Sequence, residues 1–277
     1  MKAYKVKKSV GLFLTYAALV LFSLIIALPV LWTLRTSLVN EVDAYAIPPK
    51  LFPSFTLSNY QKLFMDDGFG GFLGNSMIIS LASTALAVPI ASLGGYAFAR
   101  YKAGGDVLRF AVLATQMLPG VVLILPLFIV MSHLHLSDTY LGMTIAYLAF
   151  NLPFLIWIMS GFFANIPKDL DDAAAVDGLS PLQSFFRIIL PIALPGIMAT
   201  AVLSFIFSWN EFLFAIVLSG GNTMPIPVRL AAMRTRQGIQ IAKLSAGTII
   251  AITPMVFISG FVKKYLISGL SLGAIKS

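Results

Sequence analysis

Six stretches of the sequence carry almost no charge over a length that can cross a lipid bilayer. They lie between Lys8 and Arg35, Asp67 and Arg100, Arg109 and His133, Asp138 and Lys168, Arg187 and Arg229, and Lys243 and Lys263. A helix of about 20 apolar residues spans the hydrocarbon core of a bilayer. The chain is also 58% hydrophobic and only 11% charged, whereas soluble domains carry about 25% charged residues. We therefore predict an integral membrane protein with six spanning segments.

The apolar runs indicate helices and not the strands of a membrane barrel. In hydrocarbon the backbone polar groups must be satisfied within the protein, which leaves helices or closed barrels. Continuous runs such as Leu12–Leu31 lack the alternation of barrel strands. We predict an all-α polytopic helical bundle over residues 10–266, with tails at 1–9 and 267–277. A signal peptide is the alternative for the first stretch, but its apolar run is too long and no small-residue cleavage pattern follows.

The positions of Lys and Arg predict the orientation of the bundle, because cytoplasmic loops retain these residues near the ends of spans. With both termini in the cytoplasm, that side receives the larger group: Lys2, Lys5, Lys7, Lys8, Arg100, Lys102, Arg109, Lys168, Arg187, Lys263, Lys264 and Lys276. The loop after the fifth span opposes this trend with Arg229, Arg234, Arg236 and Lys243. We interpret that loop as a structured external element.

Several classes of chemistry are excluded by the residues present. The chain has no Cys, so it has no disulfide, thiolate nucleophile or Cys-based metal site. His133 and His135 have no carboxylate partner at metal-binding spacing, and no G-x-x-x-x-G-K-[ST] loop for a nucleotide phosphate is present. The net charge of +8 lies in clusters between spans, which argues against nucleic acid. We expect a protein that is not an enzyme and holds no metal or cofactor.

The segment from Ile166 to Pro191 has the local signals of two short helices. Pro167 fits the first turn of the first helix, Asp169, Asp171 and Asp172 suit its positive end, and Gly178 supplies the residue that ends it. Ser180, Pro181 and Gln183 then form a capping box that begins the second helix. We predict a compact helix-turn-helix over residues 166–190 that projects into the cytoplasm.

A few polar side chains lie inside the predicted spans. Glu211 is the acid of the fifth span, with Trp209 and Asn210 beside it, and Gln116 and Asn151 lie near the middle of their spans. Polar groups at such depth mark a pathway by default, and aromatic rings with amides or carboxylates suit sugars. These five residues are therefore candidates for a translocation pathway. The alternative for each is a hydrogen bond between helices.

The 166–190 segment resembles the EAA signature of ABC importer permeases. Asp172-Ala173-Ala174 stands for Glu-Ala-Ala, Asp177 and Gly178 follow, and the spacing to Pro191 matches. The resemblance implies a coupling helix seated in a cleft of a separate ATPase subunit. There Ala173 and Ala174 allow close packing, Asp172 meets a basic partner and Gly178 permits the turn. Asp at 172 departs from the usual Glu and has a shorter reach.

Further segments are similar to the carbohydrate-uptake permeases, in particular to the smaller subunit of maltose-permease-like pairs. These are residues 53–60, 75–76, 95–100, 208–213 and 268–276. The resemblance implies a type I ABC importer permease fold in a bacterial or archaeal plasma (inner) membrane. It also implies a second permease subunit, two cytoplasmic ATPases that use ATP and Mg, an extracytoplasmic solute-binding protein and a sugar substrate, most naturally an oligo- or disaccharide.

Three other functions are compatible with parts of the sequence. An ion-coupled secondary transporter would use an intramembrane acid such as Glu211. An ABC importer for a non-sugar solute, such as glycerol phosphate, would share the same motifs. A membrane scaffold without transport activity, or a lipid-handling protein, is the third.

Overall fold

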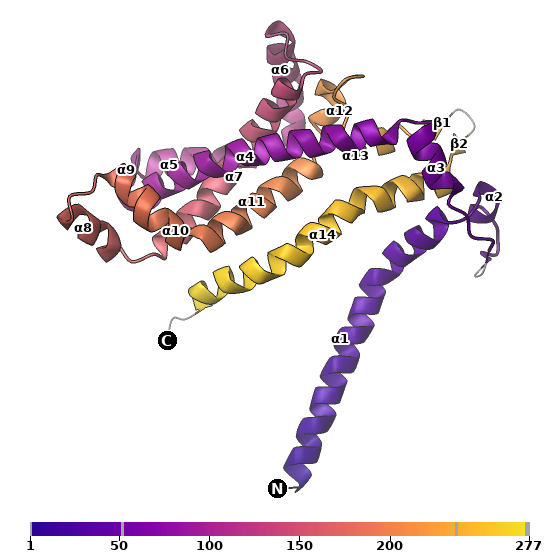
Figure 1. Ribbon diagram of the computed structural model, residues 1–277, viewed down its shortest axis with the longest axis horizontal. Coiled ribbons are helices and arrows are strands. Elements are labelled where there is room, and N and C mark those ends of the chain that lie inside the picture. The colour runs from indigo at the N-terminus through magenta and orange to yellow at the C-terminus, as the bar shows by residue number, and fades with distance from the viewer. Residues whose placement is uncertain (1, 51–52, 236–237, 275–277) are drawn as a thin grey trace. The chain divides into compact units, whose positions relative to one another are not determined.

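The computed structural model describes residues 2–50, 53–235 and 238–274 (Figure 1), and they form two compact units. The first unit contains the chain up to Phe69 together with Met233–Ile252, and the second contains Gly70–Ala232 and the chain from Thr253 on. Arg236 and Lys276, two of the cations considered for the orientation, lie outside the described residues.

The first unit is built from helices and one short strand pair. Its elements are α1 (Lys2–Ser37), α2 (Glu41–Ala44), α3 (Ser58–Met65), β1 (Arg234–Thr235), β2 (Gly238–Ile239) and the beginning of α14 (Ile241–Ala274). The strands are antiparallel, with Arg234 opposite Ile239 and Thr235 opposite Gly238. Because α1 begins at Lys2 and α14 continues to Ala274, helix extends into both predicted tails, 1–9 and 267–277.

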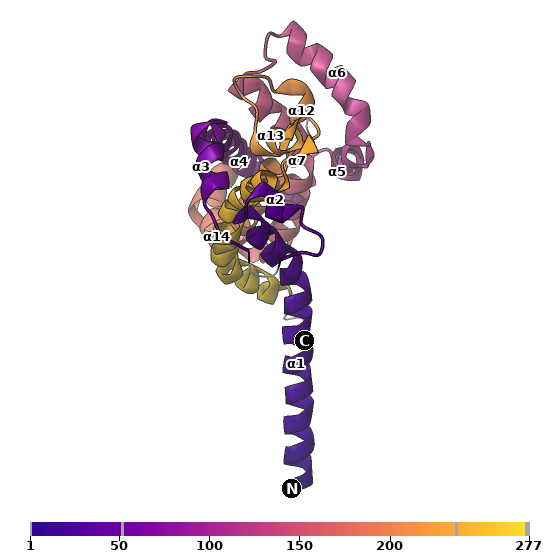
Figure 2. The ribbon, with the colours of Figure 1, turned by 90° about the vertical axis from the view of Figure 1, so that its right-hand side faces the viewer.

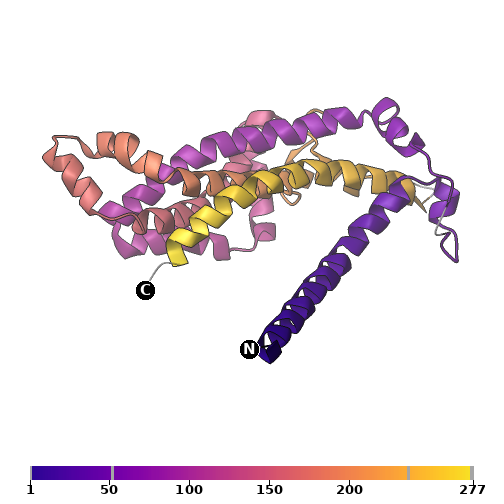
Figure 3. The ribbon, with the colours of Figure 1, turned by 60° about the horizontal axis from the view of Figure 1, so that its bottom comes forward.

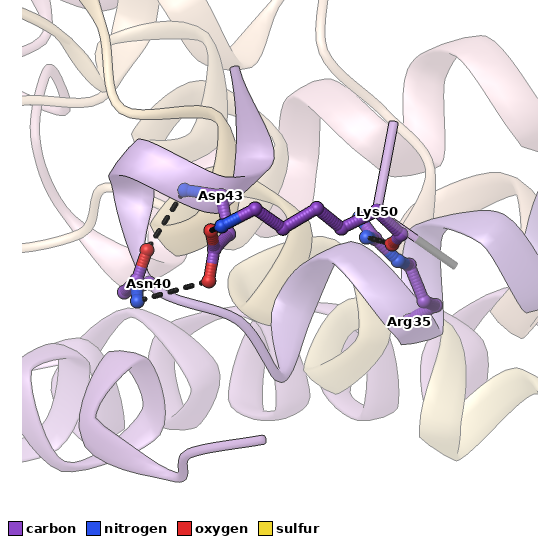
Figure 4. Close-up of polar contacts among 4 residues, drawn as sticks. All are labelled: Arg35, Asn40, Asp43 and Lys50. Carbon is purple, nitrogen blue, oxygen red and sulfur yellow. Dashed lines mark hydrogen bonds and ion pairs between the residues drawn. The ribbon is translucent and has the colours of Figure 1, made fainter. Parts of the chain in front are cut away.

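Polar contacts fold the loop after α1 back onto that helix (Figure 4). Asn40 caps α2, because its side-chain oxygen accepts a hydrogen bond of 2.8 Å from the backbone N–H of Asp43. The Asp43 carboxylate pairs with Lys50 at 2.7 Å, and the Arg35 guanidinium donates to the carbonyl of Lys50. Asn59 of α3 also donates to the carbonyls of Ser37 and Val39. The loop is therefore fixed to the end of α1.

The second unit consists of helices joined by loops, and its described residues form no strand. After α4 (Phe69–Tyr101) come α5 (Gly105–Ala114), η1 (Thr115–Met117), α6 (Gly120–His133), α7 (Tyr140–Ala164), α8 (Asp169–Val176), α9 (Pro181–Ser184), η2 (Phe185–Ile189), α10 (Leu190–Ile192), α11 (Leu194–Trp209), α12 (Ala215–Leu218) and α13 (Ile226–Ala231). Helix α12 and most of α13 lie inside the predicted fifth stretch, whereas the loop that the sequence predicts to be structured, after Arg229, contains the end of α13 and the strand pair of the first unit. Helices α4, α7 and α11 lie side by side (Figures 1 and 3).

The core of the second unit forms where small residues let these helices approach closely. A Cβ atom on Gly95 of α4 would lie 2.6 Å from Cβ of Met159 and 2.8 Å from the backbone nitrogen of Ser160, both in α7. Such small residues at helix contacts are typical of membrane bundles. One buried cluster, which includes Ala91, Tyr96 and Phe163, lies beside this contact.

Within the part of the chain that the structure describes, four helices are long and apolar enough to cross a membrane: Gly11–Ser37, Phe69–Tyr101, Tyr140–Ala164 and Ile241–Ile258. The prediction that the third and fifth stretches are each one spanning helix is wrong. The third bends by 96° between Gly105–Met117 and Gly120–His133, as Figure 2 shows for α5 and α6, and the fifth bends by 81° between Pro181–Ile192 and Leu194–Trp209. If each bent pair counts as one span, the total is six.

Proline explains both bends. Leu118 and Pro119 are extended, with ψ of 125° each, and Pro119 has no N–H to donate to the carbonyl four residues earlier. In the fifth stretch Pro195 has no N–H for the carbonyl of Pro191, and the helix breaks at Ala193, whose ψ is −3°. The apolar composition continues across both breaks, so composition alone does not reveal them.

Candidate coupling and translocation sites

The 166–190 hairpin, named here for its two short helices, forms as its local signals predict. Gly178 has a φ of +79° and ends α8, and a Cβ there would meet nothing within 4 Å. Glycine is therefore favoured by the backbone conformation and not by lack of space. The capping box is present, with the Ser180 N–H donating to Gln183 Oε1 at 2.9 Å and the Gln183 N–H donating to Ser180 Oγ.

Two details of the hairpin differ from the prediction. Pro167 lies before α8 and not in its first turn, because Lys168 is the N-cap and its carbonyl accepts from the N–H groups of Asp171 and Asp172. Ala174 is only 1% exposed, so it packs inside the chain and not on a surface that a partner could meet. Its neighbours Asp172 and Ala173 are exposed. Successive residues on a helix point in different directions, which separates the two alanines.

The outer surface of the hairpin is partly apolar. Val176 is 89% exposed, and Leu182 and Phe186 are more than half exposed. Asp172, Ala173 and Asp177 lie on the same short segment and are also exposed. Figure 3 shows the hairpin, in salmon and orange, at one end of the helices of its unit.

Asp171 anchors the hairpin to the end of α4, a role that sequence reasoning missed. Its Oδ2 lies 2.7 Å from Nε of Arg100, and its Oδ1 accepts a hydrogen bond of 2.5 Å from the hydroxyl of Tyr96. Tyr96 and Arg100 are four residues apart, which places them on one face of α4. The sequence shows a Tyr and an Arg four residues apart near the end of an apolar span, and this pattern could have indicated a polar contact at that end.

An aromatic cluster lies beside this ion pair. The ring of Tyr96 lies 5.6 Å from that of Phe163 and 4.9 Å from that of Phe185, and the last two are 6.0 Å apart. Phe163 belongs to α7 and Phe185 to the second half of the hairpin. All three side chains are at most 5% exposed. The hairpin therefore has an apolar as well as a polar attachment to the bundle.

A second polar network holds the loop between α12 and α13 near the opposite end of α4. Asp138 accepts hydrogen bonds from the backbone N–H groups of Gly220, Asn222 and Thr223 and from the side chains of the last two. Burial alone would raise the pKa of the Asp138 carboxyl, but the hydrogen bonds from Thr223, Asn222 and Gly220 hold that pKa below its ordinary value. In α4, Asn75 donates to the carbonyls of Asn222 and Met224.

Four of the five predicted pathway residues line one cavity of about 390 Å³, namely Gln116, Asn151, Asn210 and Glu211. The remaining lining residues are apolar: Phe150, Phe154, Ile206 and Phe207. Trp209, the fifth candidate, is 3% exposed and stacks on Phe205 instead. A cavity of this size with aromatic walls and a few polar groups is the usual form of a small-molecule site.

The polar groups of the cavity also form hydrogen bonds within the bundle. Both interpretations of these residues, as pathway residues and as links between helices, therefore have support. Gln116 donates to the carbonyl of Phe150 at 2.7 Å, and Asn151 donates to Ser208 at 3.1 Å. Glu211, predicted within the fifth span, lies two residues beyond the end of α11 at Trp209. Glu211 follows the helix end, where its Oε1 accepts from the N–H of Phe214 at 2.8 Å.

These features define a polytopic helical membrane protein with an exposed, anchored hairpin, which is the architecture of an importer permease. Over residues 87–271 the chain matches the family described as binding-protein-dependent transport system inner membrane component, and it belongs to that family. It is thus a multi-pass inner membrane component of a transport system and not a catalytic domain.

Relatives and a solved structure agree with this family. The chain is 35% identical over 254 residues to the trehalose transport system permease protein SugB of Mycobacterium tuberculosis, covering 90% of this chain and 92% of the relative. It is 33% identical over 262 residues to the trehalose/maltose transport system permease protein MalG of Thermococcus litoralis, covering 93% and 94%.

The fold is that of ABC importer permeases. A chain of a bacterial ABC transporter involved in the import of the acidic polysaccharide alginate superposes with a TM-score of 0.73 at 22% identity, covering 91% of this chain and 95% of that one. The predicted fold class is confirmed.

Proposed function

We propose that this chain is a permease subunit of an ATP-driven importer for a sugar, most naturally an oligo- or disaccharide. It acts with a second permease, two cytoplasmic ATPase subunits that use ATP and Mg, and an extracytoplasmic solute-binding protein. The chain itself binds no cofactor and hydrolyses no ATP. Support comes from the family, and from relatives named for trehalose and maltose transport.

The observation that carries this proposal is the 166–190 hairpin. Its first helix exposes Asp172, Ala173 and Val176, a small and partly apolar surface with one carboxylate, which suits insertion into a cleft with a basic group. Behind that surface, Asp171 and the buried Phe185 attach the hairpin to the bundle. A partner that closes on the exposed side can therefore displace the bundle.

The hairpin is on the cytoplasmic side in this proposal, together with both termini. Its anchor, Arg100, is at the end of α4, whereas Asn75, which holds the 220–226 loop, is near the start. These two residues of one helix are separated by about 38 Å at 1.5 Å per residue, more than the hydrocarbon thickness of about 30 Å. The hairpin and the 220–226 loop therefore lie on opposite sides of the membrane.

Transport follows from alternating access. ATP-driven closure of the ATPase dimer must favour one permease conformation over the other, and only contacts that differ between the two states can shift that equilibrium. The exposed hairpin surface is where such contacts form. The cavity lined by Gln116, Asn151, Asn210 and Glu211 lies on the sugar path, with rings for the C–H faces and polar groups for the hydroxyls.

The absence of Cys from the chain permits a direct test. We would introduce Ala173→Cys, attach a photo-crosslinker in membranes from cells that express the whole transporter, and identify the captured chain by mass spectrometry. The expected product is an ATPase subunit with a phosphate-binding loop. Phe55→Cys is the control, since Phe55 is 62% exposed in the loop predicted to be external.

The substrate class is tested with the purified complex in vesicles and its binding protein. Trehalose and maltose should stimulate ATP hydrolysis, whereas glycerol phosphate should not. Failure of Ala173→Cys to capture an ATPase, or capture from Phe55→Cys alone, would contradict the proposed docking site. Uptake that persists without ATP but collapses with the ion gradient would favour a secondary transporter.

A further inference from the structure

We propose that Asp171, Tyr96 and Arg100 form a positioning site that makes the 166–190 hairpin and α4 move as one body. This inference rests on the proposed function of the hairpin. It assigns to α4, a helix distant in sequence from the hairpin, the task of carrying the ATPase-driven motion across the membrane.

One carboxylate joins three segments of the chain. Asp171 belongs to α8, its Oδ2 pairs with Arg100 of α4, and its Oδ1 accepts from Tyr96 of α4 and, at 3.3 Å, from the hydroxyl of Ser184 at the end of α9. Asp171 thus adds a polar attachment to the covalent link of residues 165–168 and to the apolar packing of Leu170 and Ala174. The carboxylate thus closes the hairpin and attaches it to α4.

Arg100 also binds the link between α7 and α8. Its Nη2 donates to the carbonyl of Ile166 at 2.8 Å, while its Nε contacts Asp171. The Arg100 side chain is 4% exposed and that of Asp171 is 18% exposed. A buried charge whose partner is removed is strongly unfavourable, so the pair holds one arrangement.

Packing behind this ion pair leaves little room for the helices to slide. Gly95 precedes Tyr96, and the space for its Cβ is filled by Met159 and Ser160 of α7. On the hairpin side, Phe185 fills the space against Tyr96 and Phe163. A displacement of α8 must therefore be passed to α4 and not absorbed by a local shift.

The far end of α4 has its own attachment. From Arg100 back to Asn75 and Ser76, which bond to the backbone of the 222–226 loop, α4 is one uninterrupted helix with Pro89 inside it. This helix therefore links the ATPase-facing hairpin to a loop near the opposite end of the same unit. Helices with fixed contacts at both ends are suited to carrying energetic coupling between sites.

The first experiment measures sugar uptake per assembled complex in vesicles for Asp171→Asn, Arg100→Gln and the double variant. Each single variant should lower uptake per ATP hydrolysed by about tenfold, within the usual range of coupling between sites. The double variant should lose no more than the more impaired single variant, because the pair acts as a unit. Asp106→Asn, an exposed acid in α5, is the matched control and should keep normal uptake.

The second experiment separates transmission from a merely structural role. Nitroxide labels at Leu93→Cys on α4 and Asp169→Cys in the first turn of α8, both exposed, report the distance between the two elements. In the parent chain the distribution of label-to-label distances should have one narrow peak, at the same position in nucleotide-free and vanadate-trapped complexes. With Asp171→Asn it should broaden or change with nucleotide, while the ATPase subunits still copurify.

A label distance in the parent that changes with nucleotide would overturn the inference, as would normal uptake in both single variants. Neither result would contradict the proposed function. That proposal fails in a different way, namely if no ATPase copurifies with the unsubstituted chain.

Discussion

Single residues hold the two ends of α4 to loops that are far from it in sequence. At one end Asp171 of the hairpin accepts from Tyr96 and pairs with Arg100. At the other end Asn75 binds the loop that Asp138 also organises. Both acids accept several hydrogen bonds, and charged acceptors make the stronger ones. Their importance therefore comes from the number of segments that each carboxylate joins.

The Asp138 network predicts an acid-sensitive loop. Hydrogen bonds hold the pKa of Asp138 below its ordinary value of 3.8, so its stabilising effect is complete above that value and is lost as the pH falls through the lowered pKa. Hydrogen exchange of residues 220–223, corrected for the intrinsic rate, should accelerate below about pH 4.

Asp138→Asn is the matched variant for this prediction. It should raise exchange in the 220–223 loop by about tenfold at neutral pH, since one acceptor is replaced by a donor, and it should remove the acid dependence. Protection that is equal in both proteins at pH 7 would show that Asp138 does not hold the loop.

At the scale of elements, the hairpin depends on one backbone conformation. Gly178 ends α8 at a φ of +79°, and Asp177 and Leu179 return the chain toward the capping box at Ser180. The helix before the turn has only eight residues, and an isolated helix of such length is unstable in water, whereas α9 after the turn continues through η2 and α10. The turn and the anchors therefore carry most of the stability of the hairpin.

Substitutions at Gly178 should follow backbone preference and not side-chain volume. Space around its Cβ is open, so Gly178→Asn should be tolerated, whereas Gly178→Val should destabilise the hairpin by about 1–3 kcal/mol because β-branched residues rarely adopt positive φ. Hydrogen exchange of residues 169–184 in the purified complex measures the stability of the hairpin, and it should be faster in Gly178→Val than in Gly178→Asn.

Gly161→Ala is the control for that series. It also has open space around the Cβ atom but lies inside α7 without a positive φ, so alanine should leave the stability unchanged or raise it slightly. Equal exchange in Gly178→Asn and Gly178→Val would refute the conformational explanation.

At the scale of the whole molecule, the proposal requires that the hairpin and the loop after α1 face opposite sides of the membrane. A membrane-impermeant maleimide should label Phe55→Cys in intact cells, or in spheroplasts where an outer membrane is present, and Asp169→Cys only after the plasma membrane is opened. Both side chains are exposed, and the parent chain has no Cys to react. Labelling of Asp169→Cys from outside would reverse the orientation and withdraw the importer assignment.

Local signals in the sequence determined the membrane class, the helices and the turn of the hairpin. The bilayer thickness sets the length of an apolar span, and the Ser180 capping box and Gly178 act over a few residues. Both kinds of signal can therefore be recognised without knowing which distant residues are in contact. The same local character explains why the EAA-like segment was visible without a structure. Pro119 and Pro195 each break a helix inside a stretch whose apolar composition continues without interruption. The prediction of a single helix, which followed the composition, was therefore wrong at both places.

Only the tertiary structure decided which side chains meet. Arg100 and Asp171 are 71 positions apart, and Gln116 and Glu211, which line the same cavity, are 95 apart. Such pairs depend on how α4, α7 and α11 pack, which is set by long-range burial and close glycine contacts such as that of Gly95. The tertiary packing also determines which side of each helix is buried, which is why Ala174 faces inward while Ala173 remains exposed.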